Sequence, residues 1–394
     1  MKHKTMIHNH GTSDPLPAKV YNHGLKDAAP GKSNCIVNHE ILDCSTNDSL
    51  EKVLGVHNYS GRALGSTAPG DIIQLPAGLQ KQWDWIDKHY TKTGVHHTKN
   101  VIWDDNFNLM AEFPTYEPSV FFFGKKAHAA RPDKKWFDVV EKLNSKNNFI
   151  NICKKMKVAV PETWCFDSKS KVGEFSKFPY PCYLKIAVSV SGLGVVRCQD
   201  AQVLERELSI IDDDVPFQIQ KDVNAFAFLN LQYRKNGKLE RFLATEQVLK
   251  GCCHAGNAFP TDFQPWHFTD KIAQQMVRNG MKGYFAFDIA ACKENGSIKY
   301  YAIECNPRYN GISYPSNIAK KINAKKWVAK KISTNKTSLS DFYLGDIEFN
   351  KNSGEGVVIV NWGCVTEKEI GVLFVAPSQY RQEVLEEKLQ KIVS

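Results

Sequence analysis

The stretch that decides the fold is Phe285-Ala286-Phe287-Asp288-Ile289-Ala290-Ala291-Cys292, then Glu294-Asn295-Gly296, then Tyr300-Tyr301-Ala302-Ile303-Glu304-Cys305-Asn306-Pro307-Arg308. Asn-Gly between two strand-like runs is a strong β-hairpin signal. Side chains alternate along a strand, so Glu304 and Asn306 share a face, and the hairpin brings Asp288 roughly opposite them. Such oxygen donors suit Mg²⁺, which shares one or two carboxylates with substrate phosphates. The stretch predicts a metal site; a hairpin with an exposed acidic pair is the alternative.

Three further features of the sequence bear on the choice between the metal site and that alternative. Pro307 ends the strand, so Arg308 leaves it beside the metal, where its planar fork suits a phosphate or a carboxylate. Lys185 lies in an apolar strand, Tyr183 to Ala187, where an unpaired ammonium is costly and a phosphate would neutralise it. The loop that follows, Ser189 to Gly194, contains Gly192 and Gly194, which allow backbone N–H groups to approach an anion. An ordinary hairpin turn explains that loop about as well.

Outward from the hairpin, the middle of the chain predicts an α+β unit with antiparallel pairs. Helices are expected over 136–144 and 149–156, and strands over 182–187, 195–198, 217–220, 225–233, 242–248, 284–291 and 299–304. Before it, strands over 71–75, 100–103 and 119–123 and a helix over 79–90 predict a small α/β unit of Rossmann-like character. The first fifty residues show weak periodicity and are expected to be irregular. The tail, with strands over 356–360 and 370–375 and a helix over 380–392, is expected to pack on the middle unit.

Composition excludes several classes of protein. The chain has 394 residues, 42% hydrophobic and 24% charged, which is typical of folded globular proteins with two or three domains. No apolar run reaches the roughly 18 residues of a membrane span, and residues 1–15 lack the apolar core of a secretory signal. The 11 cysteines are scattered, as expected for reduced cytosolic thiols, so we expect a cytoplasmic protein.

Basic residues exceed acidic ones by nine, which favours anionic partners without choosing among them. Seven lysines between Lys320 and Lys336 alternate with apolar residues at roughly helical spacing, which predicts a solvated helix face. Binding of an anion or a polymer is the alternative, but we expect no nucleic-acid partner. The sequence does not indicate an oligomeric state.

Taken together, these motifs resemble the ATP-grasp superfamily over roughly residues 140 to 320. The matching elements are Asn144-Ser145-Lys146, Val160-Pro161-Glu162-Thr163, Tyr183-Leu184-Lys185, the loop Ser189 to Gly194, Gln218-Ile219-Gln220-Lys221-Asp222-Val223, and the hairpin end Glu304 to Arg308. The hinge, where family members often have Glu, here is Gln-Ile-Gln-Lys-Asp.

The resemblance implies an ATP-grasp fold of two α+β lobes over 141–335, preceded by a Rossmann-like pre-ATP-grasp domain over 1–140 and followed by strands and a helix over 336–394. It implies ATP and Mg²⁺ (or Mn²⁺) as cofactors, with Asp288, Glu304 and Asn306 on the metal. The nucleotide-binding residues would be Lys146, Lys185, Ser191, Gly192, Gly194, Gln220, Lys221 and Val223. Arg308 would stabilise an acyl phosphate, with Lys185 as the second catalytic residue.

The implied activity is that of a ligase that activates a carboxylate as an acyl phosphate for attack by an amine, with small molecules or peptides as substrates. Positioning and charge neutralisation dominate such phosphoryl transfer, so no protein nucleophile is needed. His254 and Asn257 lie between hinge and hairpin, where substrate contacts are expected, and His254 is a candidate proton acceptor. An ordinary loop histidine, an ATP-dependent kinase of small molecules and a non-catalytic nucleotide-binding protein are the alternatives.

Overall fold

A computed structural model describes residues 34–44, 54–189, 194–251 and 253–394. The loop residues Ser191 and Gly192, and most of the first fifty residues, lie outside the described residues. No helix in the described ranges is long and apolar enough to span a membrane.

The N-terminal unit is a parallel four-stranded sheet in the order β3-β2-β1-β4. Its strands are β1 (Cys35–Asn38), β2 (Ile72–Gln74), β3 (Asn100–Ile102) and β4 (Glu117–Val120). The prediction of a Rossmann-like α/β unit is confirmed. The prediction that the first fifty residues are irregular was wrong for β1, because this strand is only four residues long and is flanked by polar residues that hide its apolar pattern.

Helices fill the connections of this unit and lead to the next one. The α-helices here are α1 (Trp83–Thr93), α2 (Lys125–Ala130), α3 (Lys134–Asn144) and α4 (Lys146–Lys155). The Ser145 side chain caps α4 by accepting a hydrogen bond from the Asn148 backbone N–H, so that α4 begins at Lys146. The 3-10 helices in the described part of the chain are η1 (Leu42–Cys44), η3 (Val56–Ser66), η4 (Ala77–Gln82), η5 (Phe107–Glu112), η6 (Lys169–Lys171), η7 (Phe175–Lys177), η8 (Leu339–Asp341), η9 (Gly345–Ile347) and η10 (Gly363–Glu367).

A small antiparallel sheet follows, in the order β5-β8-β6-β7. Its strands are β5 (Thr163–Phe166), β6 (Cys182–Ile186), β7 (Val195–Cys198) and β8 (Phe217–Lys221), and α5 (Ala201–Ser209) packs on it. Leu184, Leu204 and Phe217 belong to an apolar core that is separate from the main one. We call this unit the small lobe.

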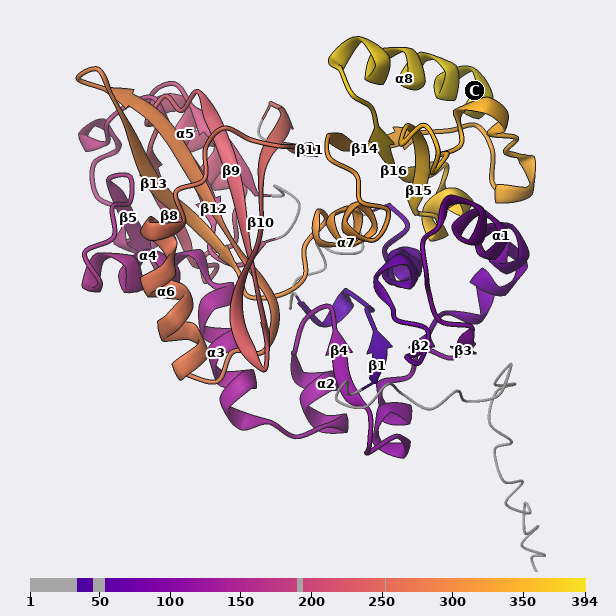
Figure 1. The fold of residues 1–394 in the computed structure, drawn as a ribbon. Coiled ribbons are helices and arrows are strands. Elements are labelled where there is room, and N and C mark those ends of the chain that lie inside the picture. Colours follow the sequence, from indigo (N-terminus) through magenta and orange to yellow (C-terminus); the bar gives the residue numbers. More distant parts are fainter. Residues whose placement is uncertain (1–33, 45–53, 190–193, 252) are drawn as a thin grey trace, which may run out of the picture.

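The largest sheet has eight strands in the order β13-β12-β9-β10-β11-β14-β16-β15 (Figure 1). Its strands are β9 (Ala227–Asn236), β10 (Lys238–Lys250), β11 (Cys253–Phe259), β12 (Gly283–Glu294), β13 (Ser297–Asn306), β14 (Trp327–Ser333), β15 (Gly356–Asn361) and β16 (Glu369–Val375). The remaining helices are α6 (Trp266–Arg278), α7 (Ser313–Lys321) and α8 (Gln379–Val393). Figure 1 shows β9, β10, β12 and β13 on one side of α7 and β14 to β16 on the other, near α8.

The prediction of a solvated helix between Lys320 and Lys336 was wrong. The helix α7 ends at Lys321, and residues 327–333 form β14, which pairs with β11 and β16. Apolar residues spaced at 327, 328 and 332 fit either period, and the buried Trp327 and Ala329 belong to the strand pattern. Because β14 pairs with β16, the boundary that we propose at residue 335 falls between two bonded strands.

Candidate functional site

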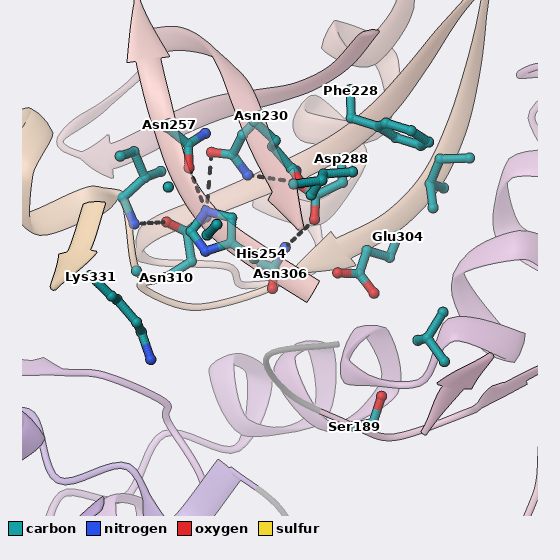
Figure 2. Close-up of a pocket in the computed structure, with 18 of the residues that line it drawn as sticks. Ser189, Phe228, Asn230, His254, Asn257, Asp288, Glu304, Asn306, Asn310 and Lys331 are labelled. Atoms are coloured by element: carbon teal, nitrogen blue, oxygen red, sulfur yellow. Dashed lines mark hydrogen bonds between the residues drawn. The ribbon is translucent and has the colours of Figure 1, made fainter. Parts of the chain in front are cut away.

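A cavity of about 340 Å³ lies where the three parts of the chain meet. The small lobe contributes Lys185 and Ser189, the large sheet Asp288 and Glu304, and the N-terminal unit Arg62. Figure 2 shows side chains of the large sheet, among them Asp288 and Glu304, gathered on one side of this space. The cavity therefore collects residues that are far apart in the sequence.

The hairpin β12–β13 positions the two carboxylates. Its turn residues Asn295 and Gly296 have φ values of 49° and 77°, as a tight hairpin turn requires. A β-bulge between Asp288 and Ile289 then shifts the register, which sets Asp288 opposite Glu304 and Ala286 opposite Asn306. The predicted hairpin and its three oxygen-bearing side chains are thus brought together on one face.

Amide groups surround Asp288. Its Oδ1 accepts hydrogen bonds from Asn230 Nδ2 at 2.6 Å and from Gln247 Nε2 at 2.8 Å, and its Oδ2 accepts one from Asn306 Nδ2 at 3.1 Å. Burial, followed by the negative charge of Glu304, raises the pKa of Asp288 well above its usual value. With Nδ2 of Asn306 turned to Asp288, the Oδ1 of Asn306 is left as an acceptor.

Glu304 faces cations instead. Lys146 Nζ lies 3.1 Å from Glu304 Oε2 and donates to Ser189 Oγ at 3.0 Å. Burial opposes the ionisation of Glu304, but Lys146, Asp288 and Lys185 together outweigh it and lower the pKa of Glu304 to about 2. Lys146, at the start of α4, thereby links the small lobe to the metal-binding hairpin.

Lys185 is buried on β6 beside the strand that leads to the hinge. Its Nζ donates to Gln220 Oε1 at 2.7 Å and lies 5.4 Å from the centre of the Tyr183 ring, while Gln220 Nε2 donates to Thr163 Oγ1 at 2.9 Å. Gln220, Lys221 and Val223 all line the cavity.

The glycine loop is described only at its ends. Gly194 has a φ of +69°, and a Cβ atom there would lie 2.6 Å from Ile186 Cδ1. Glycine is therefore required where β7 begins. Ser191 and Gly192 lie outside the described residues.

His254 and Asn257 lie in the cavity wall on β11. The ring nitrogen Nε2 of His254 is 2.5 Å from Asn257 Oδ1, and Asn257 Nδ2 donates to Thr245 Oγ1 at 2.9 Å. Burial lowers the pKa of His254, against the effect of its hydrogen bond to Asn257, so the ring is neutral at pH 7. A neutral imidazole can accept a proton.

Arg308 lines the same cavity and lies two residues after the end of β13. Its Nη1 donates to the Tyr309 carbonyl at 3.1 Å, and its guanidinium carbon lies 5.2 Å from the centre of the Phe121 ring. Its Nε is buried without a hydrogen-bond partner.

Sequence reasoning identified neither Asn230 nor Arg62. Asn230 and Gln232 alternate with Leu229 and Leu231 on β9, and both polar side chains are buried. Amides buried in an apolar strand need partners, so this alternation was the available signal. Arg62, in the irregular-looking η3, had no such signal.

The hairpin predicts a Mg²⁺ ion bound by Asp288, Glu304 and Asn306. The described residues hold no group of three or more His, Cys, Asp and Glu side chains arranged for a metal ion. Two carboxylates and one amide oxygen are too few to enclose a cation alone, but they fit Mg²⁺, which keeps waters and shares substrate phosphates. Asp288, Glu304 and Asn306 therefore fit this ion.

The fold is shared with solved structures at low sequence identity. N5-carboxyaminoimidazole synthetase from Staphylococcus aureus, complexed with ADP, is 12% identical with a TM-score of 0.57, over 92% of this chain and 97% of that chain. A biotin carboxylase–β-γ-ATP complex from Campylobacter jejuni is 12% identical with a TM-score of 0.59, over 91% of each chain. N5-carboxyaminoimidazole ribonucleotide synthetase from Thermus thermophilus is 11% identical with a TM-score of 0.54, over 91% of this chain and 98% of that chain. Neither the scan against family models nor the search of curated proteins finds a match.

Proposed function

Because the chain has the ATP-grasp fold, we propose that it is an ATP- and Mg²⁺-dependent ligase that activates a carboxylate as an acyl phosphate for attack by an amine. ADP and phosphate are the other products, and the substrates are small molecules or peptides. The observation that carries the proposal is the convergence of Asp288, Glu304, Lys146 and Lys185 on one cavity. The similar solved structures that are complexed with ADP or β-γ-ATP support it.

ATP lies, in this proposal, between the small lobe and the large sheet. Lys146 and Lys185 bind its phosphates, because both ammonium groups are buried at the cavity and a phosphate compensates a buried cation. The hinge residues Gln220 to Val223 hold the adenine. When bound, Mg²⁺ offsets the charge of the phosphate oxygens, and Asp288, Glu304 and Asn306 hold it.

The proposed reaction has two steps. A carboxylate oxygen of the substrate attacks the γ-phosphorus, the bond to ADP breaks, and an acyl phosphate forms. The amine then attacks the acyl carbon, phosphate leaves, and the amine proton passes to His254. Arg308 orients the acyl phosphate, because a guanidinium fork matches the oxygens of carboxylate and phosphate.

The test is ATP consumption with Mg²⁺ against pooled amino acids, short peptides and small carboxylates, with nucleotides and adducts identified by mass spectrometry. We expect ADP together with a product whose mass is that of two pool components minus one water. Glu304→Ala should abolish turnover without lowering the melting temperature markedly. As the control, Glu383→Ala, at an exposed position on α8, should leave turnover unchanged. ADP with a phosphorylated pool component would make the protein a kinase, and undiminished turnover in Glu304→Ala would contradict the metal site.

A further inference from the structure

Three cations line one wall of the cavity, joined by two aromatic rings. The guanidinium carbons of Arg308 and Arg62 lie 5.2 Å and 5.0 Å from the centre of the same Phe121 ring. Arg62 also lies 4.7 Å from the centre of the Tyr59 ring, and Lys331 Nζ lies 2.8 Å from the Tyr59 hydroxyl. The order along the wall is therefore Arg308, Arg62 and Lys331, which starts at the metal-binding hairpin and leads away from it.

Arg62 is held firmly but is not neutralised. It is 6% exposed, and the rings of Tyr59, Phe121 and Tyr314 surround its guanidinium, the last at 4.4 Å. Its Nε is buried without a hydrogen-bond partner, and no carboxylate among the described residues forms an ion pair with it. Arg308 shares both properties. A buried charge without a counter-ion is costly, so Arg62, with the half-buried Arg308 at the same cavity, indicates an anionic ligand.

The charges along the cavity support a second anion. Of the described residues that line it, seven are Lys or Arg and three are Asp or Glu, which leaves an excess of cations. Asp288 and Glu304 both lie at the metal-binding end. Figure 2 shows Lys331 at the other end from Ser189 and Glu304. Lys331 has its own partner, Glu369 at 3.3 Å, so the charge available at that end is chiefly that of Arg62.

We propose that Arg62, assisted by Lys331, binds a second anionic group of the substrate, a carboxylate or a phosphate, while Arg308 binds the carboxylate that reacts. This inference rests on the proposed function and extends it, since it narrows the substrate to molecules with two anionic groups. The Arg62 fork supplies two parallel donors, and the Lys331 ammonium on β14 adds a third. Hydrogen bonds to a charged group contribute about 1.5–3 kcal/mol, or roughly 10- to 150-fold in affinity.

The test compares matched pairs of anions. Titration calorimetry is carried out on the full chain with Mg·ADP and again without nucleotide, using succinate against butyrate, glutarate against valerate, and 3-phosphoglycerate against glycerate. We expect at least one doubly anionic probe to bind 10-fold or more tighter than its partner. The dicarboxylate and phosphate pairs show which group the site prefers. Equal affinity within every pair overturns the proposal, and failure of ADP to bind contradicts the proposed function separately.

Variants locate the effect. Arg62→Gln should reduce the preferred probe to the affinity of its singly charged partner, and Arg62→Lys should retain part of the difference. The exposed Arg206→Gln on α5 is the matched control and should bind as the wild type does. If Arg62→Gln lowers the melting temperature, Lys331→Gln serves as a second variant with a smaller expected loss. An undiminished preference in folded Arg62→Gln overturns the assignment.

Discussion

The substitution Gln247→Leu tests the amide cradle around Asp288. Leu has a volume close to that of Gln and removes one hydrogen bond, the 2.8 Å contact from Nε2 to Asp288 Oδ1. The remaining bonds from Asn230 and Asn306 keep the carboxylate in place but leave Oδ1 with one donor in place of two. Loss of such an outer partner weakens metal binding by about 10- to 100-fold. Because Gln247 is a positioning residue, raised Mg²⁺ should restore function.

The assay is calorimetric titration of ATP at a series of Mg²⁺ concentrations. We expect the half-maximal Mg²⁺ concentration to rise about 10-fold or more, with the ATP affinity at saturating Mg²⁺ and the melting temperature unchanged. Gln274→Leu, at an exposed position on α6, is the control. An unchanged Mg²⁺ requirement, or a loss of ATP binding that Mg²⁺ does not restore, would refute the reasoning.

Three further predictions concern stability. Gln218→Leu should raise the free energy of unfolding by about 1–3 kcal/mol in urea titrations, because both polar atoms of this buried amide lack partners; a lower value would contradict this. Burial, followed by the positive charge of Arg62, lowers the pKa of His39 to about 3, so the ring stays neutral in the folded protein. The contribution of His39 to the free energy of unfolding should therefore be complete above pH 6.5 and fall by about 2 kcal/mol at pH 5. The substitution His39→Gln should remove this loss. Gly194→Ala should cost more in melting temperature than Gly237→Ala, since both have a φ of +69° but only the former meets Ile186; equal costs would exclude the steric clash.

The hairpin could be predicted because its signals are local. The Asn-Gly turn fixes the register to within one residue, and a β-bulge between Asp288 and Ile289, which the turn does not indicate, sets Asp288 opposite Glu304. Lys185 could be identified for a similar reason, since a charge inside an apolar strand is visible in five residues. Such features need no knowledge of distant contacts.

Other parts of the site depend on contacts between distant residues. Asn230 is hydrogen-bonded to Asp288, which lies 58 residues further along the chain. Arg62 becomes part of the site only because η3 packs near Phe121 and Tyr314. The prediction for the lysine-rich segment was wrong for another reason. Apolar residues at 327, 328 and 332 fit both the helical and the strand period, and the segment forms a strand because it pairs with β11 and β16. Strand β1 is too short for any period to show.

The separate core of the small lobe has a consequence for motion. Because Leu184, Leu204 and Phe217 pack among themselves, the lobe can rotate as a rigid body without disturbing the main core. Its polar contacts to the large sheet include Lys146, which lies between Ser189 and Glu304. A ligand that binds Lys146 in place of Ser189 and Glu304 replaces a contact between the small lobe and the large sheet with a contact of its own. Ligand binding and the angle between the small lobe and the large sheet are therefore coupled.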